Sequence, residues 1–366
     1  MNTTHGEIGM QPPISRYASY IKNLIPAAIP TDYALKPIFK DIANEENIRN
    51  GIIAFRDFLY LFCDNLISDG DLYAKPQKRS NPEDYPFLSH INNLLIVIGY
   101  HGKLSESSDS LFITEIPSFL HPKPKIPVSK QMECLRFLSL CGFVFTDIDL
   151  NARVFNISDS ALEVLYPKNP TLLTGLKALS IAAKELQVRF YNNAANLLRC
   201  DYRAIKVENT DILDVLKDIL HPLPEKIQKF AIELHQRYVG MGMTCVTIYD
   251  NASHFAYAYI KNSKRALSSR DIYQQRLWAL TVSMKYGYCL MVRAKKTDKY
   301  VDVINKFPLY LQEKIAKGYG CDRTLRGERC QGGCQGIRIP LDNSIVDMKP
   351  DIETWLDNEL PRSAGK

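Results

Sequence analysis

The spacing of apolar residues changes near residue 243, and this change constrains the fold of the 366-residue chain more than any other feature. Before it, apolar residues recur every three or four positions, the period of a helix with one buried face; an example is Ile48, Ile52, Phe55, Leu59, Phe62 and Leu66. After it, they alternate with polar residues, so that Phe255, Tyr257 and Tyr259 share one side of a strand. The sequence therefore predicts an α+β fold, with helices first and an antiparallel sheet with covering helices afterwards.

Two proline-rich stretches, 74–86 and 121–127, divide the N-terminal half. After each, a helical pattern ends at a glycine, Gly99 or Gly142, and a hairpin pattern follows. Helix, glycine and hairpin in this order are typical of a winged helix, and a plain helix–hairpin pair is the alternative. We expect an N-terminal helical segment at 1–73, winged-helix-like units at 81–120 and 128–166, a helical region at 170–240, and an α+β domain with a Cys/Gly-rich tail at 243–360. Residues 14–67 are predicted to be helical.

The cysteines and the N-terminus favour a cytoplasmic protein. Six of the nine cysteines stand singly in apolar surroundings, where a thiol is usually a small core residue. The first residues lack a basic segment followed by an apolar one, so we expect no secretion signal and a reducing compartment. No apolar run approaches the ~18 residues that span a bilayer, so we expect no membrane partner.

The tail contains Cys321, Cys330 and Cys334 among several glycines. Thiolates with such gaps can converge on one tetrahedral zinc ion, which makes these three residues candidate metal ligands. The fourth ligand would come from His235, His254, Cys289 or a water molecule. The alternatives are an iron–sulfur cluster, and three free thiols whose pKa values are lowered by the neighbouring arginines and which act in redox chemistry.

Positive charge gathers in residues 261–299. The whole chain has a net charge of +6, while this stretch holds ten basic and two acidic side chains, so the remainder is slightly acidic. A basic sheet with aromatic side chains can hold phosphates and stack bases. We therefore expect this region to bind a small molecule or nucleic acid through Tyr257, Tyr259, Arg276, Trp278, Arg293 and Lys295. A solvated sheet face with basic loops is the alternative.

The helices of the two winged-helix-like units carry few groups that could read DNA. Residues 84–98 contain no lysine or arginine, and residues 129–141 contain only Lys130 and Arg136. A recognition helix usually presents basic or amide side chains to the groove. The composition therefore favours protein packing or ligand sensing over sequence reading.

Parts of the chain resemble an uncharacterised family of cytosolic Firmicutes proteins. The resemblance covers roughly residues 129–360 and is most specific at Arg329-Cys330-x-Gly332-Gly333-Cys334-x-Gly336-Ile337. It also includes Cys141-Gly142-Phe143, Tyr166-Pro167, Leu172-Leu173-Thr174-Gly175-Leu176-Lys177, Arg199-Cys200-Asp201-Tyr202-Arg203 and Gly318-x-Gly320-Cys321. It implies a bacterial protein in which the cysteine tail belongs to the family's pattern, and it implies no activity.

Catalytic signatures are scarce. The sequence has no Gly-x-Ser-x-Gly, no His-Glu-x-x-His, no phosphate-binding loop of the Gly-Lys-Ser/Thr type and no dinucleotide fingerprint. We therefore expect a non-catalytic binding or regulatory protein, with a small molecule or nucleic acid as ligand, zinc as candidate cofactor and a second copy of the chain as a candidate partner. The alternative is an enzyme that uses the cysteine cluster for thiol redox or metal-assisted chemistry.

Overall fold

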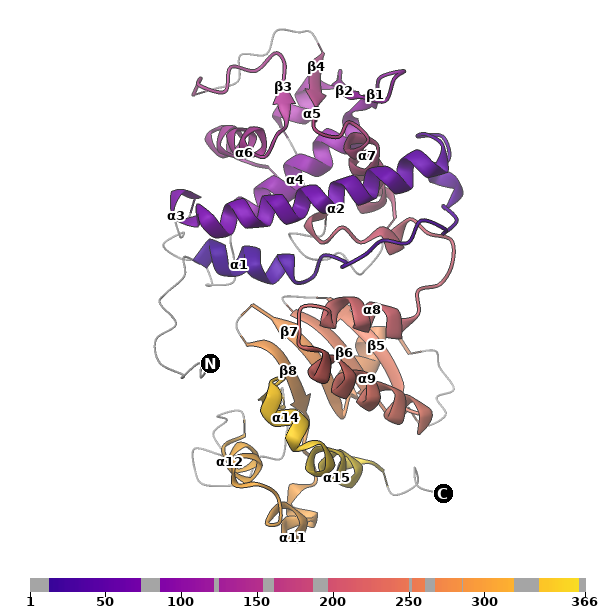
Figure 1. Cartoon of the computed structure of the whole chain (residues 1–366), viewed down its shortest axis with the longest axis vertical. Helices are drawn as coiled ribbons and strands as arrows, with labels where there is room; N and C mark the ends of the chain where they lie inside the picture. Colours follow the sequence, from indigo (N-terminus) through magenta and orange to yellow (C-terminus); the bar gives the residue numbers. More distant parts are fainter. Residues whose placement is uncertain are drawn as a thin grey trace. The chain divides into compact units, whose positions relative to one another are not determined.

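The computed structural model (Figure 1) describes most of the chain. The described residues are 13–73, 86–121, 125–153, 161–186, 197–249, 252–260, 267–284, 286–318 and 336–361. They form two compact units, residues 1–210 and 211–366, each with its own helices and antiparallel sheet. The predicted α+β class is confirmed.

Helices dominate the first unit. They are α1 (Pro13–Lys22), α2 (Glu45–Ser68), α3 (Gly70–Tyr73), α4 (Pro86–His101), α5 (Ile116–Leu120), α6 (Val128–Leu140) and α7 (Leu172–Glu185), with short 3-10 turns η1 (Pro37–Phe39), η3 (Leu197–Arg199) and η4 (Tyr202–Ala204). Asn44 begins α2 by accepting a hydrogen bond from the Asn47 amide. The segment predicted to be helical over 14–67 consists mainly of α1 and α2, and between them Pro26, Pro30 and Pro37 interrupt helical hydrogen bonding.

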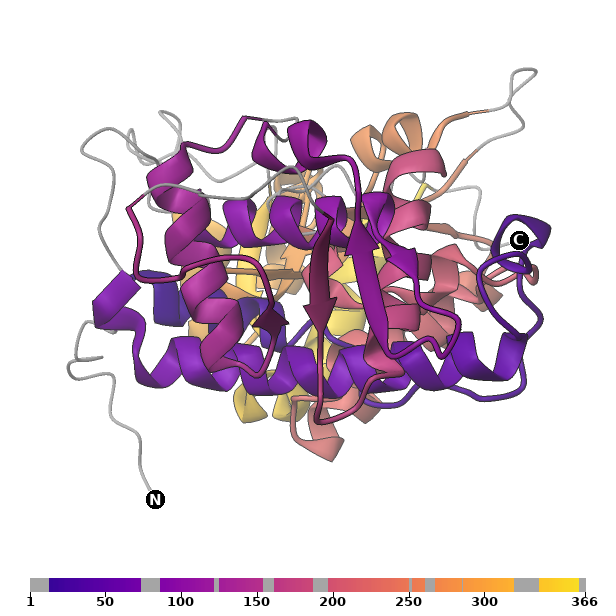
Figure 2. The ribbon, with the colours of Figure 1, turned by 90° about the horizontal axis from the view of Figure 1, so that it is seen from above.

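One four-stranded sheet joins the two predicted winged-helix-like units (Figure 2). Its strands β1 (Lys103–Leu104), β2 (Ser110–Ile113), β3 (Val144–Phe145) and β4 (Leu162–Leu165) lie in the order β1-β2-β4-β3, all antiparallel. The first hairpin, β1 with β2, matches the predicted one. In the second, β3 pairs with β4, whereas the predicted second strand at 154–158 lies outside the described residues. Because β2 pairs with β4, the two predicted winged-helix-like segments of the first unit share one sheet.

The second unit is built around a five-stranded antiparallel sheet in the order β5-β6-β7-β8-β9. The strands are β5 (Thr244–Tyr249), β6 (Ala252–Ala258), β7 (Trp278–Ser283), β8 (Gly287–Val292) and β9 (Ile337–Pro340). The helices are α8 (Ile212–Leu220), α9 (Glu225–Gly240), α10 (Ser269–Gln274), α11 (Val301–Ile304), α12 (Leu309–Lys317), α14 (Asn343–Asp347) and α15 (Lys349–Glu359), with the turn η5 (Thr297–Lys299). The predicted sheet, its β7–β8 hairpin and the helices after it are confirmed.

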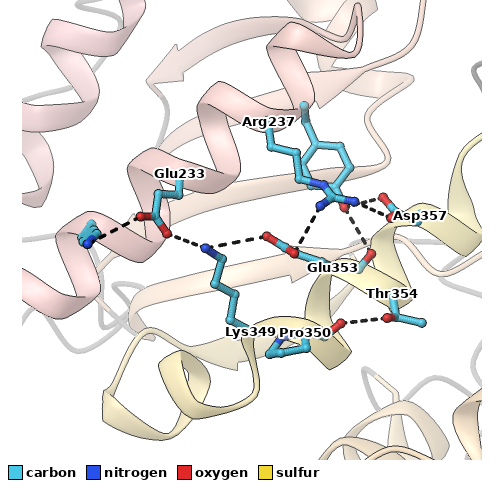
Figure 3. Close-up of polar contacts among 9 residues, drawn as sticks. Glu233, Arg237, Lys349, Pro350, Glu353, Thr354 and Asp357 are labelled. Atoms are coloured by element: carbon cyan, nitrogen blue, oxygen red, sulfur yellow. Dashed lines mark hydrogen bonds and ion pairs between the residues drawn. The ribbon is translucent and has the colours of Figure 1, made fainter.

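Helices pack against both faces of this sheet: α8 and α9 lie across one face in Figure 1, and α10 packs on the other through Tyr273. The core beneath α8 and α9 includes Phe255 and Leu280, and Trp278 stacks against the Tyr257 ring with centroids 3.7 Å apart. Ion pairs attach α15 to α9 (Figure 3): Arg237 contacts Asp357 at 2.6 Å and Glu353 at 3.2 Å. We call the face beneath α8 and α9 the covered face, and it forms a hydrophobic core of the unit.

Candidate anion-binding site

The strand register determines which side chains share the opposite face of the second sheet. Ala256, Ala279, Met291 and Arg338 are neighbours on consecutive strands from β6 to β9, and side chains alternate along each strand. His254 lies one row away on the same face. We call this side the cationic face. The two alanines are small and Tyr273 of α10 packs against them, so that α10 brings its C-terminal end next to the sheet.

Arg276 is the buried centre of the site. A capping box between Ser268 and Asp271 starts α10, and the chain leaves the helix directly before Arg276. Only 5% of Arg276 is exposed. Its Nη1 donates to the Tyr273 carbonyl at 2.8 Å, and its guanidinium carbon lies 3.9 Å from the centre of the Tyr273 ring. These contacts orient the guanidinium group and partly offset the cost of removing it from water.

Two further guanidinium groups come from neighbouring strands. Arg293, directly after β8, donates to the Gln274 carbonyl. Arg338, in β9, lies with its guanidinium carbon 4.3 Å from the centre of the Tyr286 ring. Burial, and then the positive charges of Arg293 and Arg338, lower the pKa of Arg276. The three cations are therefore close enough to repel one another.

The same charges act on two neighbouring groups. Burial is the main reason that the pKa of His254 falls to about 4, and the charges of Arg276 and Arg338 lower it further. The His254 ring lies 5.2 Å from that of Tyr273 and is neutral at physiological pH. Burial and the charge of Arg293 lower the pKa of Lys295, which lies exposed at the rim. Several basic side chains therefore lie together at this corner of the sheet.

The arrangement is suited to an anion. The carbonyl contacts of Arg276 and Arg293 help to orient their side chains. A guanidinium group offers paired N–H donors that match the oxygens of a phosphate or carboxylate. An anion among Arg276, Arg293 and Arg338 would relieve their mutual repulsion, and neutral His254 could exchange a hydrogen bond with it.

The structure brings together three of the residues predicted to bind a ligand and separates the others. Arg276, Arg293 and Lys295 belong to the cationic site. Tyr257 and Trp278 lie on the covered face and are 0% and 1% exposed, so neither ring offers a surface to a ligand. Tyr259 is half-buried just beyond the end of β6.

Those two rings are held by core contacts. Trp278 packs against Tyr238 of α9 at a centroid distance of 5.3 Å. The Tyr257 hydroxyl and His235 Nδ1 are 2.9 Å apart and share a hydrogen bond. Burial raises the pKa of Tyr257 and lowers that of His235, so both groups are neutral. The group around Tyr257 is therefore a satisfied buried polar contact inside the core.

Sequence reasoning did not assign Tyr286 and Arg338 to a ligand site. Arg338 is the one basic residue of β9 and stands between two apolar neighbours, Ile337 and Ile339, which are fully buried. This alternation identifies Arg338 as facing away from the core. Its pairing with the earlier basic stretch, however, depends on the contact between β8 and β9.

The predicted metal ligands Cys321, Cys330 and Cys334 lie outside the described residues. Within the described ranges, no group of three His, Cys, Asp or Glu side chains could hold a metal ion. Of the residues considered for a fourth ligand, His254 and Cys289 lie on the cationic face, and His235 is engaged with Tyr257 on the other. The six singly placed cysteines are buried free thiols, as predicted.

Comparison with known proteins gives no match to a family model, to a curated protein or to a solved structure. Among the residues with described structure, no helix is both long and apolar enough to cross a bilayer. The functional argument accordingly depends on the site itself.

Proposed function

We propose that this protein is a non-catalytic binding protein whose second unit holds a phosphate-bearing anion on the cationic face. Arg276, Arg293 and Arg338 would contact the phosphate oxygens, and Lys295 would add charge at the rim. The observation that carries the proposal is the convergence of Arg338 of β9 and Arg293, directly after β8, on Arg276, which is almost fully buried. A phosphate group offers several oxygens and up to two negative charges, which suits three guanidinium donors better than a carboxylate does.

The described thiols favour binding over thiol catalysis. Burial raises the pKa of Cys289 to about 11 and that of Cys245 to about 12. A thiol is nucleophilic only as the thiolate, so these groups are unreactive near neutral pH. The enzyme alternative therefore depends on Cys321, Cys330 and Cys334.

Calorimetric titration with pyrophosphate and inorganic phosphate at low salt tests the proposal. Arg293→Gln and Arg338→Gln each remove one charged donor and should weaken binding by about tenfold, because a hydrogen bond to a charged group contributes about 1.5–3 kcal/mol. Lys299→Gln, an exposed lysine of the same basic segment, is the matched control and should bind like the wild type. Equal affinities in all three variants would refute the assignment, and so would the absence of binding to correctly folded wild-type protein.

We also propose a structural zinc site at Cys321, Cys330 and Cys334. The spacing of these thiols among glycines supports it. Metal analysis of protein purified without chelators should find one zinc ion per chain, together with slow reaction of these thiols with a disulfide reagent. Fast-reacting thiols without metal would instead support the redox alternative.

For the first unit we propose two winged-helix-like modules that serve for packing rather than for reading DNA. Each half supplies a helix followed by two strands, α4 with β1 and β2, then α6 with β3 and β4. The order β1-β2-β4-β3 is what two such hairpins form when their second strands pair. Binding to duplex DNA that is lost in Lys130→Ala or Arg136→Ala would contradict the packing role.

A further inference from the structure

The four-stranded sheet of the first unit has one buried face and one accessible face. The buried face includes four side chains with no exposed surface, those of Leu111, Ile113, Leu162 and Val164. Side chains alternate along each strand, so the residues between these four point to the other side, which we call the outer face. On the outer face Phe112 of β2 is 37% exposed and Val144 of β3 is 43% exposed. In Figure 2 this sheet lies in front of the helices of its unit.

A lysine and a glutamate stand on either side of Phe112. Lys103 of β1 lies directly opposite Phe112, and Phe112 lies directly opposite Glu163 of β4, so the three residues form one row across three strands. Residues directly opposite each other point to the same face of a sheet. Strands lie about 4.8 Å apart, which separates the two charged residues by roughly 10 Å. Lys103 is exposed and Glu163 half-buried, and within the described ranges neither takes part in an ion pair.

This row is complementary to a second copy of itself. When two outer faces are stacked with a two-fold axis running along β2 between them, the rotation exchanges the two ends of the row. Lys103 of each copy then faces Glu163 of the other, and the two Phe112 rings meet at the axis. Contacts between identical faces are repeated by the two-fold axis in this way. Stacked sheets lie about 10 Å apart, a gap that side chains from both sheets fill.

The charges of the row favour a second copy over other occupants. A single exposed ring is ordinary on a protein surface, so the neighbours of Phe112 decide whether this face is an interface. A polyanion or an anionic membrane surface would be attracted by Lys103 but repelled by Glu163. A second copy, by contrast, supplies an opposite charge to each end of the row and an apolar ring to its centre.

We propose that the outer face of the first unit's sheet is the interface of a homodimer, with Phe112 packed on its copy and Lys103 paired with Glu163 across the two-fold axis. The proposal goes beyond the anion site of the second unit and does not depend on it. The strands in the row are short, with two residues in β1 and four each in β2 and β4. Interfaces of small area are typical of weak, transient association, so we expect monomer and dimer to coexist at micromolar concentrations.

Sedimentation equilibrium of the full chain, from micromolar to near-millimolar concentration, measures this association. Lys103→Glu and Glu163→Lys each place like charges opposite each other and should weaken dimerisation at least about tenfold. An equimolar mixture of these two variants should dimerise again, since each supplies the charge that the other requires. Phe112→Ala should also weaken dimerisation about tenfold, as truncation of a central aromatic residue predicts. Leu72→Ala, at a 73% exposed apolar residue of α3, is the matched control and should dimerise like the wild type.

The mixture separates a lost contact from a misfolded chain, because it contains only chains that fail to dimerise separately. A wild type that stays monomeric over the whole range overturns the proposal. Wild-type dimerisation in Phe112→Ala and in both charge variants overturns it too, because the contact then lies elsewhere. A mixture that associates no better than its components overturns the pairing of Lys103 with Glu163. Pyrophosphate binding should be unchanged in every variant, so these results leave the test of the anion site independent.

Discussion

Replacing Gly175 by alanine should destabilise the first unit, because two helices touch there through their main chains. Gly175 of α7 faces Gly51 of α2. A Cβ atom at residue 175 would lie 2.2 Å from the Gly51 carbonyl carbon and oxygen and 2.5 Å from the Ile52 nitrogen. An ordinary contact needs at least 3.4 Å, so the helices would have to separate by about 1.2 Å. Main-chain atoms are unable to rotate away as a side chain does.

The expected loss follows from two opposing terms. Overpacking a well-packed core costs about 1–3 kcal/mol, and a clash with main chain belongs at the upper end. Alanine recovers roughly 1 kcal/mol through its higher helix propensity. The net destabilisation is therefore about 2 kcal/mol. For a unit of this size it should lower the Tm by about 4–8 °C.

Urea unfolding followed by far-UV circular dichroism measures this loss. Both tryptophans, Trp278 and Trp355, lie in the second unit, so tryptophan emission reports on that unit alone. Hydrogen exchange should show faster exchange of the α2 and α7 amides in Gly175→Ala. The control is Gly240→Ala in α9, where an added Cβ meets no atom within 4 Å and where stability should rise slightly. Wild-type stability in Gly175→Ala would refute the close approach of the two helices.

Two further predictions concern the second unit. Glu359 is 1% exposed, and its carboxylate accepts from the amides of Lys295 at 2.9 Å and Lys296 at 3.1 Å and from the Tyr300 hydroxyl. Glu359→Gln weakens these charge-assisted bonds and should cost about 1.5–3 kcal/mol in urea unfolding monitored by tryptophan emission, and unchanged stability would contradict this role. The pKa of His254 is about 4 in the folded state against 6.5 in the unfolded state, so the unfolded chain binds the extra proton between these values. Stability should fall by up to about 3 kcal/mol as the pH drops from 6.5 to 4, and His254→Gln should flatten this dependence, whereas the same slope in the variant would contradict it.

Local patterns in the sequence are sufficient to predict the second unit's sheet but not that of the first. Alternation identifies Phe255 and Tyr257 as neighbours on one side of a strand. A glycine at residue 287 predicts the turn of the β7–β8 hairpin, and in the structure Gly287 has a positive φ of 61°. In the first unit, β2 pairs with β4, a strand about fifty residues later. Nothing local distinguishes this pairing from two separate hairpins, because both bury the same alternate residues. The choice is made by the tertiary packing of α4, α6 and α7.

The candidate site also has a part that the sequence predicts and a part that it does not. Charge density predicts that Arg276, Arg293 and Lys295 lie in one region, since long-range charge clusters are visible in composition. Alternation assigns residues to two faces of a sheet without saying which face the helices cover. The third arginine, Arg338, reaches the site only because β9 pairs with β8. A contact between segments nearly fifty residues apart is set by the tertiary fold and is not predictable from local residue spacing.

The position of an aromatic ring within its helix, strand or turn indicates whether the ring is buried in the core or stays accessible. Tyr257 and Trp278 lie within paired strands, where burying a large ring beneath a helix gives the largest hydrophobic gain. Tyr286 lies in the turn between β7 and β8, and Tyr310 lies in the first turn of α12, where no second layer covers them fully. The burial of the strand rings and the partial exposure of these two rings therefore have the same cause, which is the hydrophobic gain available at each position. In this sheet, rings at turns and helix starts are thus more accessible than rings at strand centres.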